Sequence, residues 1–326
     1  MWAKNSRKEP TVSHWGELKL LQEIRHWLGD ASPPPPEGIG DDAAILKNPA
    51  LPSVLTNDSL VYGKHFTREA PPESVGAKLL KRCISDLAAM GTKPHYALLG
   101  CLLPPDTAVE WLQSFYAGLK NTARAYDIKI VGGDVTSTHR DLAFSMTLTG
   151  YLEANRPLTR KSGRPGDTLW VTGQLGGSSA GKHLHFEPRL KEGIWLANHG
   201  GVTSAIDISD GLGIDLYHLA PAAGVICLDT AKIPISPSSH DMAGSSGHSP
   251  LWHAFNDGED YELLFTVQPG CGKDAFARDW QREFDTPVTC IGRLEEPEKG
   301  EGDDIRLTGP GHAEDLLGGY EHFRST

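Results

Sequence analysis

The stretch SDLAAMG, residues 85–91, closes a segment whose pattern predicts a buried helix, and it carries a single acidic side chain. Helical spacing places Asp86 on one apolar stripe with Leu79, Cys83 and Met90. A glycine and a nearby proline indicate that the helix ends just after this stretch. The helix dipole disfavours a carboxylate at that end, so Asp86 requires a specific partner.

Four other segments place acidic residues at or beside the ends of predicted elements. They are GIGDDAAI with Asp41 and Asp42, LTNDSL with Asp58, VGGDVTS with Asp134, and DISDGLGIDL with Asp207 and Asp210. Taken singly, each is explained by a turn or, for Asp210 and Ser209, by the cap of the next helix. Taken together, carboxylates at strand ends of an α/β protein face the usual ligand crevice, where they repel one another unless a cation lies among them.

Magnesium suits these residues, because Mg²⁺ binds hard oxygen ligands and bridges them to phosphate oxygens. The net charge is −11 at pH 7, so a phosphate ester would be held only through local cations, helix N-termini or metal ions. We therefore expect a Mg²⁺–nucleotide enzyme in which Asp86 faces metal. The alternative partners for Asp86 are Lys81 and Arg82, which lie on other faces of the same helix.

The composition is that of an ordinary folded protein of 326 residues, with 39% hydrophobic and 22% charged residues. The acidic net charge argues against nucleic acid as a partner, and no apolar run approaches the roughly 20 residues of a membrane helix. The N-terminal MWAKNSRKEP lacks the apolar core of a signal peptide. The five cysteines are scattered without CxxC spacing, so we expect a reduced, cytoplasmic protein without disulfides or a zinc site.

Alternating helix and strand patterns in both halves predict an α/β fold. Helices are expected at 15–27, from 72 through SDLAAMG, at 106–126 and at 212–222. Strands are expected at 43–47 and 53–57, and within 92–104, 127–134, 141–153, 167–173, 204–211, 260–267 and 287–296. The strand at 127–134 is predicted to end in a glycine turn, residues 155–167 to form the domain boundary, and residues 236–250 to form an exposed loop.

The segment GGSSAGKH, residues 176–183, has the GxxxxGK spacing of a phosphate-binding loop, with Lys182 at the lysine position. His183 stands where that motif needs Ser or Thr to coordinate Mg²⁺, and a histidine cannot take that role. A phosphate-binding loop here would also leave the acidic segments unexplained. We therefore interpret the segment as a glycine-rich connection from a strand to a helix.

Seven segments, in their order along the chain, resemble the thiamine-monophosphate kinase family. They span residues 38–267 and read GIGDDAAIL, TNDSLVYGKHF, KLLKRCISDLAAMGTKP, IVGGDVTST, LTRKSGRPGD, SAIDISDGLGIDL and GEDYELLFTV. Parts of the combination are shared with the wider superfamily of aminoimidazole ribonucleotide synthetase and selenophosphate synthetase. The LTRKSG and GEDYELLF segments favour the thiamine enzyme within it.

The resemblance implies a two-domain α/β protein. Residues 1–153 would form an N-terminal domain that binds ATP and Mg²⁺ and whose sheet pairs across a homodimer. Residues 154–326 would form a second α/β domain that closes over nucleotide and substrate. The implied reaction transfers a phosphoryl group from ATP to thiamine monophosphate, giving thiamine diphosphate, with several Mg²⁺ ions and no general base.

The resemblance also implies a set of site residues. The metal ligands would be Asp42, Thr56, Asn57, Asp58, Asp86, Asp134, Asp207 and Asp210. ATP would be contacted by Tyr116, Gly133, Asp134, Arg160 and Ser209. Thiamine monophosphate would be contacted by His65, Glu259 and, at the position of the family's C-terminal aromatic residue, Leu317.

Three positions depart from the family pattern, namely Asn57, Asp257 and Leu317. The leucine removes an aromatic contact with the cationic thiazolium ring, worth about 0.5–2 kcal/mol, unless Trp252 or Tyr320 replaces it. Two other functions stay open at this point. One is a superfamily enzyme with another small phosphorylated acceptor, and the other is a catalytically silent protein that binds Mg-nucleotide.

Overall fold

The computed structural model describes residues 10–34, 37–39, 44, 46, 50–154, 156–221, 224–297, 304–312 and 316–317. The chain divides into two compact units. Unit 1 consists of residues 1–87 and 93–153, and unit 2 consists of residues 88–92 and 154–326. Among the described residues, no helix is long and apolar enough to cross a membrane.

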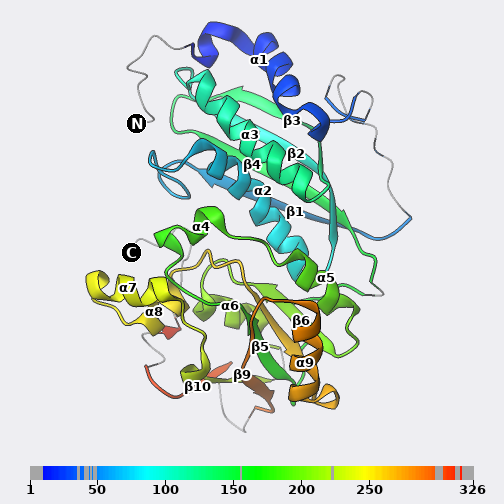
Figure 1. Cartoon of the computed structure of the whole chain (residues 1–326), viewed down its shortest axis with the longest axis vertical. Coiled ribbons are helices and arrows are strands. Elements are labelled where there is room, and N and C mark those ends of the chain that lie inside the picture. Colours follow the sequence, from blue (N-terminus) through cyan, green and yellow to red (C-terminus); the bar gives the residue numbers. More distant parts are fainter. Residues whose placement is uncertain are drawn as a thin grey trace. The chain divides into compact units, whose positions relative to one another are not determined.

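Unit 1 contains a four-stranded sheet in the order β1-β4-β2-β3 (Figure 1). Its strands are β1 (Ser53–Val61), β2 (Lys93–Leu103), β3 (Lys129–Ser137) and β4 (Ala143–Tyr151), and its helices are α1 (Val12–Leu28), α2 (Pro72–Ala89) and α3 (Val109–Ala125). Strand β4 runs antiparallel to β1 and β2, whereas β2 and β3 are parallel. The three predicted helices of this region are confirmed. The predicted strand at 43–47 falls mostly outside the described residues.

One face of this sheet is covered by α2 and α3 (Figure 1). Side chains alternate along the strands, so buried residues such as Leu99 and Phe144 point to the helices. The ring of Phe115 in α3 stacks on Phe144 with 4.1 Å between centroids. The opposite face carries exposed leucines, with Leu55 65% and Leu98 46% exposed.

Unit 2 contains a six-stranded sheet in the order β10-β7-β9-β5-β8-β6. Its strands are β5 (Thr168–Thr172), β6 (Val202–Asp207), β7 (Val225–Asp229), β8 (Leu263–Val267), β9 (Val288–Glu295) and β10 (Ile305–Thr308). Its α-helices are α4 (Lys182–His185), α5 (Leu190–Asn198), α6 (Leu212–Leu219), α7 (Pro237–Ser246), α8 (Pro250–Asn256) and α9 (Lys273–Glu283). Both predicted halves therefore have the expected mixture of helices and strands.

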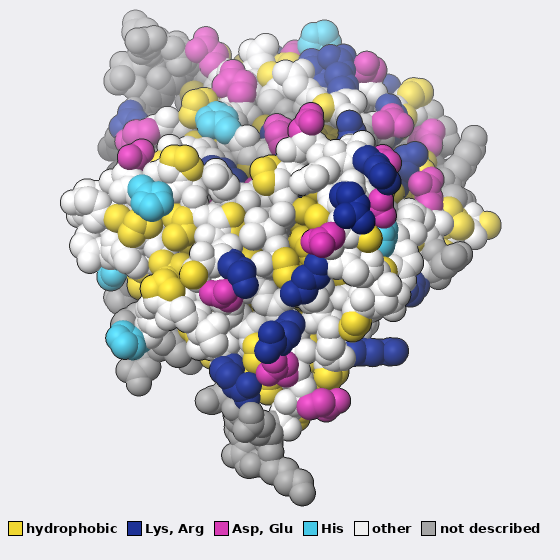
Figure 2. Space-filling view, turned by 60° about the horizontal axis from the view of Figure 1, so that its bottom comes forward, with side chains coloured by type: hydrophobic (Ala, Val, Ile, Leu, Met, Phe, Trp, Pro, Cys, Tyr) yellow, Lys and Arg dark blue, Asp and Glu magenta, His cyan; other side chains and the backbone are white. Residues whose placement is uncertain are grey.

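Both faces of this second sheet are buried, each in its own core. Leu169 and Val171 of β5 pack with α6 and α8, whereas Trp170 between them packs with Phe276 and Trp280 of α9. All five residues of β8 are buried as a consequence, including the polar Thr266. On the surface drawn in Figure 2, acidic side chains lie among the basic ones.

The prediction of a loop at 236–250 is wrong, because these residues form α7 and the start of α8, although most of them are exposed as expected. Ser236 caps α7 by accepting a hydrogen bond from the N–H of Ser239, and Pro237 occupies the first helical turn. The serine-rich composition favoured a loop, although Ser236 followed by Pro237 is a typical helix start. The predicted helix at 212–222 ends earlier, at Leu219, because Ala220 precedes a proline and takes an extended conformation.

Candidate functional site

Polar side chains gather where β1 faces α2. The hydroxyl of Thr56 donates a hydrogen bond to the carboxylate of Asp86. A guanidinium nitrogen of Arg82 lies 2.9 Å from a carboxylate oxygen of Asp58. Asp86 therefore has the partner that its position requires, a hydroxyl from the neighbouring strand, while Arg82 neutralises the second carboxylate.

The thiol of Cys83 lies in the negative potential of these two carboxylates. Burial raises the pKa of Cys83 well above its usual range, and the charges of Asp58 and Asp86 raise it further. Two carboxylates near one buried point favour any cation that can reach them. This part of unit 1 is therefore the strongest candidate for a cation site on the helix-covered face of the sheet.

The sheet register places Asn57 and Asp134 on the other face. The hydroxyl of Ser145 donates to the side-chain oxygen of Asn57 at 3.2 Å. Asp134 lies opposite Gly100, which in turn lies opposite Ser145, so all of these residues share that face. A single ion cannot bind Asp58 and Asp134 directly from opposite faces of a sheet, so the expected ligand set requires more than one ion.

The predicted glycine turn after residue 131 is wrong, because β3 continues through Gly133 and Asp134 to Ser137. A side chain at Gly133 would place its Cβ 1.9 Å from the carbonyl oxygen of Leu99 on β2. The glycine is therefore required for close approach of two paired strands. Asp134 projects from the middle of a strand and not from a turn.

Tyr116 lies in the interior of unit 1, although the family resemblance implies contact with ATP. Its side chain is 2% exposed and packs against Trp27, with 5.7 Å between ring centroids. Its hydroxyl lies 3.4 Å from the sulfur of Cys101, and burial raises the pKa of Tyr116 well above its usual range. We therefore leave Tyr116 out of the proposed nucleotide site.

His65 is held in one ring orientation by the loop that follows β1. Its Nδ1 accepts a hydrogen bond from the N–H of Val61 at 3.0 Å, which leaves Nε2 as the donor nitrogen of the ring. The fully buried Lys78 donates to the carbonyl of His65 at 2.8 Å. These contacts fix the orientation of the imidazole ring.

In unit 2, Asp207 ends β6, and Ser209 and Asp210 follow it before α6. Neither of the last two caps the helix with its side chain, because Gly211 occupies the N-cap position. Instead the carboxylate of Asp215 accepts hydrogen bonds from the backbone N–H groups of Ser209 and Asp210, at 3.0 and 3.2 Å. Asp215 is buried, and it is a structural residue that the sequence analysis did not single out.

Glu259 lies in a turn whose backbone is unusual. Glu259 and Tyr261 have φ angles of 53° and 52°, in the left-handed region that residues other than glycine rarely adopt. The N–H groups of these two residues donate to the carbonyls of Ser209 and Ile208, at 2.7 and 2.8 Å. The structure thus brings Glu259 beside Ser209, and the expected substrate and nucleotide residues meet here.

Arg160 and Leu317 are the remaining expected site residues of unit 2. Arg160 is exposed, and its charge contributes, after burial, to a lowered pKa of His218 in α6. Leu317 is partly buried and packs against the core that contains Leu251 and Leu316. The leucine therefore serves the fold through this apolar contact.

Among the described residues, no three or more His, Cys, Asp or Glu side chains form a group that could hold a metal ion by themselves. The expected ligand Asp42 lies outside the described residues.

The sequence analysis missed a network of buried charges beside the Glu259 turn. It consists of Asp260, Glu262, Arg189 and Lys182, the last at the end of the glycine-rich segment. The interpretation of that segment as a strand-to-helix connection is confirmed, because it joins β5 to the short helix α4. The GxxxxGK spacing could have indicated this network, because it places Lys182 close to backbone N–H donors that bind anions.

Comparisons with known proteins agree with this architecture. A family described as AIR synthase related protein, N-terminal domain, matches residues 40–152. Thiamine-monophosphate kinase from Rhodopirellula baltica is 37% identical over 267 residues, covering 79% of this chain and 83% of that relative. The crystal structure of thiamine-monophosphate kinase from Stenotrophomonas maltophilia has a TM-score of 0.74 and 30% identity, covering 89% of this chain and 96% of that one.

A further solved structure is described as AaThiL complexed with AMPPCP and TMP. It has a TM-score of 0.69 and 30% identity, and the match covers 97% of this chain and 100% of that chain. The match at residues 40–152 thus defines the class, a protein with an AIR-synthase-related N-terminal domain. The sequence identity to thiamine-monophosphate kinases over most of the chain is more specific than this domain match. The chain belongs to the thiamine-monophosphate kinase family.

Proposed function

We propose that this protein transfers the γ-phosphoryl group of ATP to thiamine monophosphate, giving ADP and thiamine diphosphate. The observation that carries the proposal is the similarity to AaThiL complexed with AMPPCP and TMP, which extends over 97% of this chain. The placement of Glu259 beside Ser209 supports it, because one substrate residue and one nucleotide residue then lie on adjoining segments.

The chemistry needs positioning more than it needs a proton acceptor. A phosphate oxygen of thiamine monophosphate attacks the γ-phosphorus, and the bond to the β–γ bridging oxygen breaks to release ADP. The second pKa of a phosphate monoester is about 6, so the nucleophile is largely ionised near neutral pH. No general base is therefore required, and the protein must align two anions and offset their repulsion.

This repulsion would be offset by Mg²⁺ ions bound to carboxylates and by the exposed guanidinium of Arg160. We propose that Mg²⁺ ions are held on unit 1 by Thr56, Asp58 and Asp86 on one sheet face and by Asn57 and Asp134 on the other, with Asp42 included. Asp207 and Asp210 would serve the same purpose on unit 2. All of these side chains offer hard oxygen atoms, which fits Mg²⁺. When bound, Mg²⁺ neutralises charge on the phosphates and orients them.

Six further residues would contact the two substrates. Ser209 and Gly133 would lie at ATP, and the exposed guanidinium of Arg160 would pair with its phosphates. Glu259 would face the positive charge of the thiamine group, and the ring of His65 would donate from Nε2. Leu317 would supply only an apolar contact, so we expect weaker affinity for thiamine monophosphate than an aromatic residue would give.

We also propose that the protein works as a homodimer formed through unit 1. The sheet face opposite α2 and α3 exposes Leu55, Leu98 and Leu102, at 65%, 46% and 40%. Exposed leucines on one face of a sheet favour a protein partner, and a second copy of the same face would bury them.

We further propose a cytoplasmic setting. All five cysteines are free thiols, and Cys83 and Cys101 are buried within unit 1. A reducing compartment keeps such thiols unpaired.

The decisive experiment is a turnover assay with purified protein, ATP, MgCl₂ and thiamine monophosphate, with thiamine diphosphate separated by chromatography. A parallel reaction contains excess EDTA. We expect product that EDTA abolishes. Binding of ATP without product would contradict the proposal and indicate a silent nucleotide-binding protein or another phosphorylated acceptor.

A further inference from the structure

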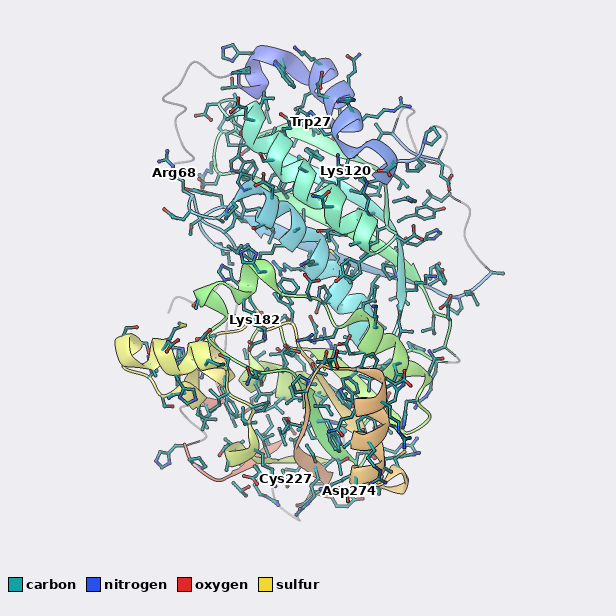
Figure 3. All side chains as sticks on the ribbon, viewed as in Figure 1. Trp27, Arg68, Lys120, Lys182, Cys227 and Asp274 are labelled. Atoms are coloured by element: carbon teal, nitrogen blue, oxygen red, sulfur yellow. The ribbon has the colours of Figure 1, made fainter. Side chains whose placement is uncertain are left out.

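Lys182 ends a glycine-rich segment that has phosphate-loop spacing, yet its ammonium group is bound within its own unit. The labelled Lys182 lies at the beginning of α4 (Figure 3). Its Nζ donates to the carbonyl of Gln174 at 2.8 Å and to the carboxylate of Glu262 at 3.0 Å, and it lies 3.5 Å from Asp260. The Lys182 side chain is 29% exposed, whereas the Asp260 side chain is completely buried.

The glycine-rich segment also binds carboxylates through its backbone, and one of them, Asp260, is shared with Lys182. The N–H of Gly176 donates to both oxygens of Asp260, at 2.9 and 3.0 Å. The N–H of Gly177 donates to the carboxylate of Asp257 at 2.8 Å. Backbone donors followed by a lysine, which could cradle a phosphate, therefore hold the protein's own anions.

Glu262 completes the buried network. The guanidinium of Arg189 binds it through two hydrogen bonds of 2.7 and 2.8 Å, and the hydroxyl of Thr172 donates to it at 2.8 Å. Burial alone would raise the pKa of Glu262, but Arg189 and Lys182 outweigh that effect and lower it. Lys182 and Arg189 thus contact two carboxyl groups that are buried in unit 2.

This network flanks the left-handed turn that carries Glu259. Asp260 follows Glu259 directly, and Tyr261 separates Asp260 from Glu262. Left-handed φ angles at Glu259 and Tyr261 cost free energy, so they persist only where neighbouring contacts hold them. The fastened carboxylates of Asp260 and Glu262 are such contacts.

We propose that Lys182 is a positioning residue for substrate binding. Its charge holds the carboxylates of Asp260 and Glu262 and thereby keeps Glu259 in the orientation that receives thiamine monophosphate. This inference rests on the proposed function, in which Glu259 contacts that substrate.

The structure also indicates that Lys182 affects one substrate more than the other. The segment with Ser209 and Asp210 is held by Asp215, whose carboxylate accepts both backbone N–H groups without involving Lys182. Loss of Lys182 should therefore loosen the Glu259 turn while most of the nucleotide segment stays in place.

The test is steady-state kinetics of Lys182→Met in the full chain, with each substrate varied in turn. We expect the KM for thiamine monophosphate to rise by about tenfold and the KM for ATP by less than about threefold. Lys182→Arg should recover most of the loss, because it keeps the positive charge. Lys191→Met, a change at an exposed lysine of α5, is the matched control and should behave as wild type.

Unchanged KM values in folded Lys182→Met, equal increases for both substrates, or a fall in kcat alone would each overturn the inference. If Lys182→Met does not fold, Asp260→Asn decides, because its amide oxygen still accepts from Gly176. That variant should show the same preferential rise in the KM for thiamine monophosphate, and equal KM changes there would overturn the inference. A wild-type protein that makes no thiamine diphosphate would overturn the proposed function itself, and the inference with it.

Discussion

Asp86 illustrates how a charged residue on a buried stripe finds a partner. Its helix neighbours Lys81 and Arg82 were the alternatives in the sequence, and the structure adds a hydrogen bond from Thr56 on β1. Arg82 pairs with Asp58, so two carboxylates and one guanidinium lie in the same small region. Each side chain is satisfied without metal, yet the oxygen atoms are suited to receive one.

Asp86→Asn should separate stability from activity. The asparagine oxygen can still accept from Thr56, so we expect a folded protein whose thermal midpoint changes little. Loss of the negative charge should lower turnover by more than about 100-fold at any magnesium concentration. Asp127→Asn, at an exposed turn, is the control. Full activity of Asp86→Asn would refute the metal assignment.

Asp260 predicts a pH dependence of stability. Burial raises its pKa from 3.8 to about 7, although Lys182 and the Gly176 N–H oppose that shift and Glu262 adds to it. A raised pKa in the folded state stabilises the protein below about pH 4, and this contribution is lost as the pH rises through about 7. Asp260→Asn cannot ionise and loses nothing over that range.

Thermal unfolding of wild type and Asp260→Asn at about pH 5 and about pH 8 measures this effect. We expect the midpoint of the variant, relative to wild type, to be higher at the alkaline pH than at the acidic pH. A difference that stays constant between the two pH values would show that Asp260 does not titrate in this range.

At the scale of elements, α2 and α3 pack closely through small residues. A Cβ at Gly118 in α3 would lie 1.9 Å from the carbonyl oxygen of Glu73 in α2. Backbone atoms cannot move aside as a flexible side chain can, so the helices would have to separate.

Gly118→Ala should lower the free energy of unfolding by about 3 kcal/mol through this overpacking. Gly244→Ala in α7 is the matched control, because a Cβ there meets nothing within 4 Å. The control should stabilise by up to about 1 kcal/mol, since alanine is the better helix former. Urea unfolding monitored by circular dichroism gives both values, and an equal effect of the two changes would contradict the close-packing argument.

At the scale of the whole molecule, the proposed dimer depends on the outward sheet face of unit 1. Leu55 and Leu98 lie on the same face, because their cross-strand neighbours Thr149 and Thr147 are two residues apart on β4. Their exposure is far greater than that of leucines on the covered face.

The double variant Leu55→Asp/Leu98→Asp should therefore be monomeric under conditions where wild type sediments as a dimer. Aspartates on a buried interface would be desolvated and would repel their symmetry mates. Tyr217→Asp, which changes an exposed aromatic residue of unit 2, should sediment as wild type does. A monomeric wild-type protein would contradict the proposed dimer.

The periodic pattern of the sequence was sufficient to predict much of the fold. The stripe containing Leu79 and Cys83 predicted α2, and the apolar runs predicted strands in both halves. An element that buries one face repeats its apolar residues at its own helical or strand spacing, and an element that buries both faces is apolar along its length. The segments around Asp58, Asp134 and Glu259 also identified the family without coordinates. Local patterns failed at 236–250, where a polar helix has no apolar stripe to reveal it.

What the sequence alone determined was therefore the family, and with it the residues that are proposed to carry the chemistry. Only the tertiary structure decided which face of a sheet each one occupies, since register separates Asp58 from Asp134 across one sheet. The tertiary structure also decided that Lys182 binds Asp260 and Glu262, although these two residues lie about 80 positions away from it in the sequence. Side-chain type is a local property, whereas a buried charge is stabilised by whichever opposite charge the fold brings within hydrogen-bond distance.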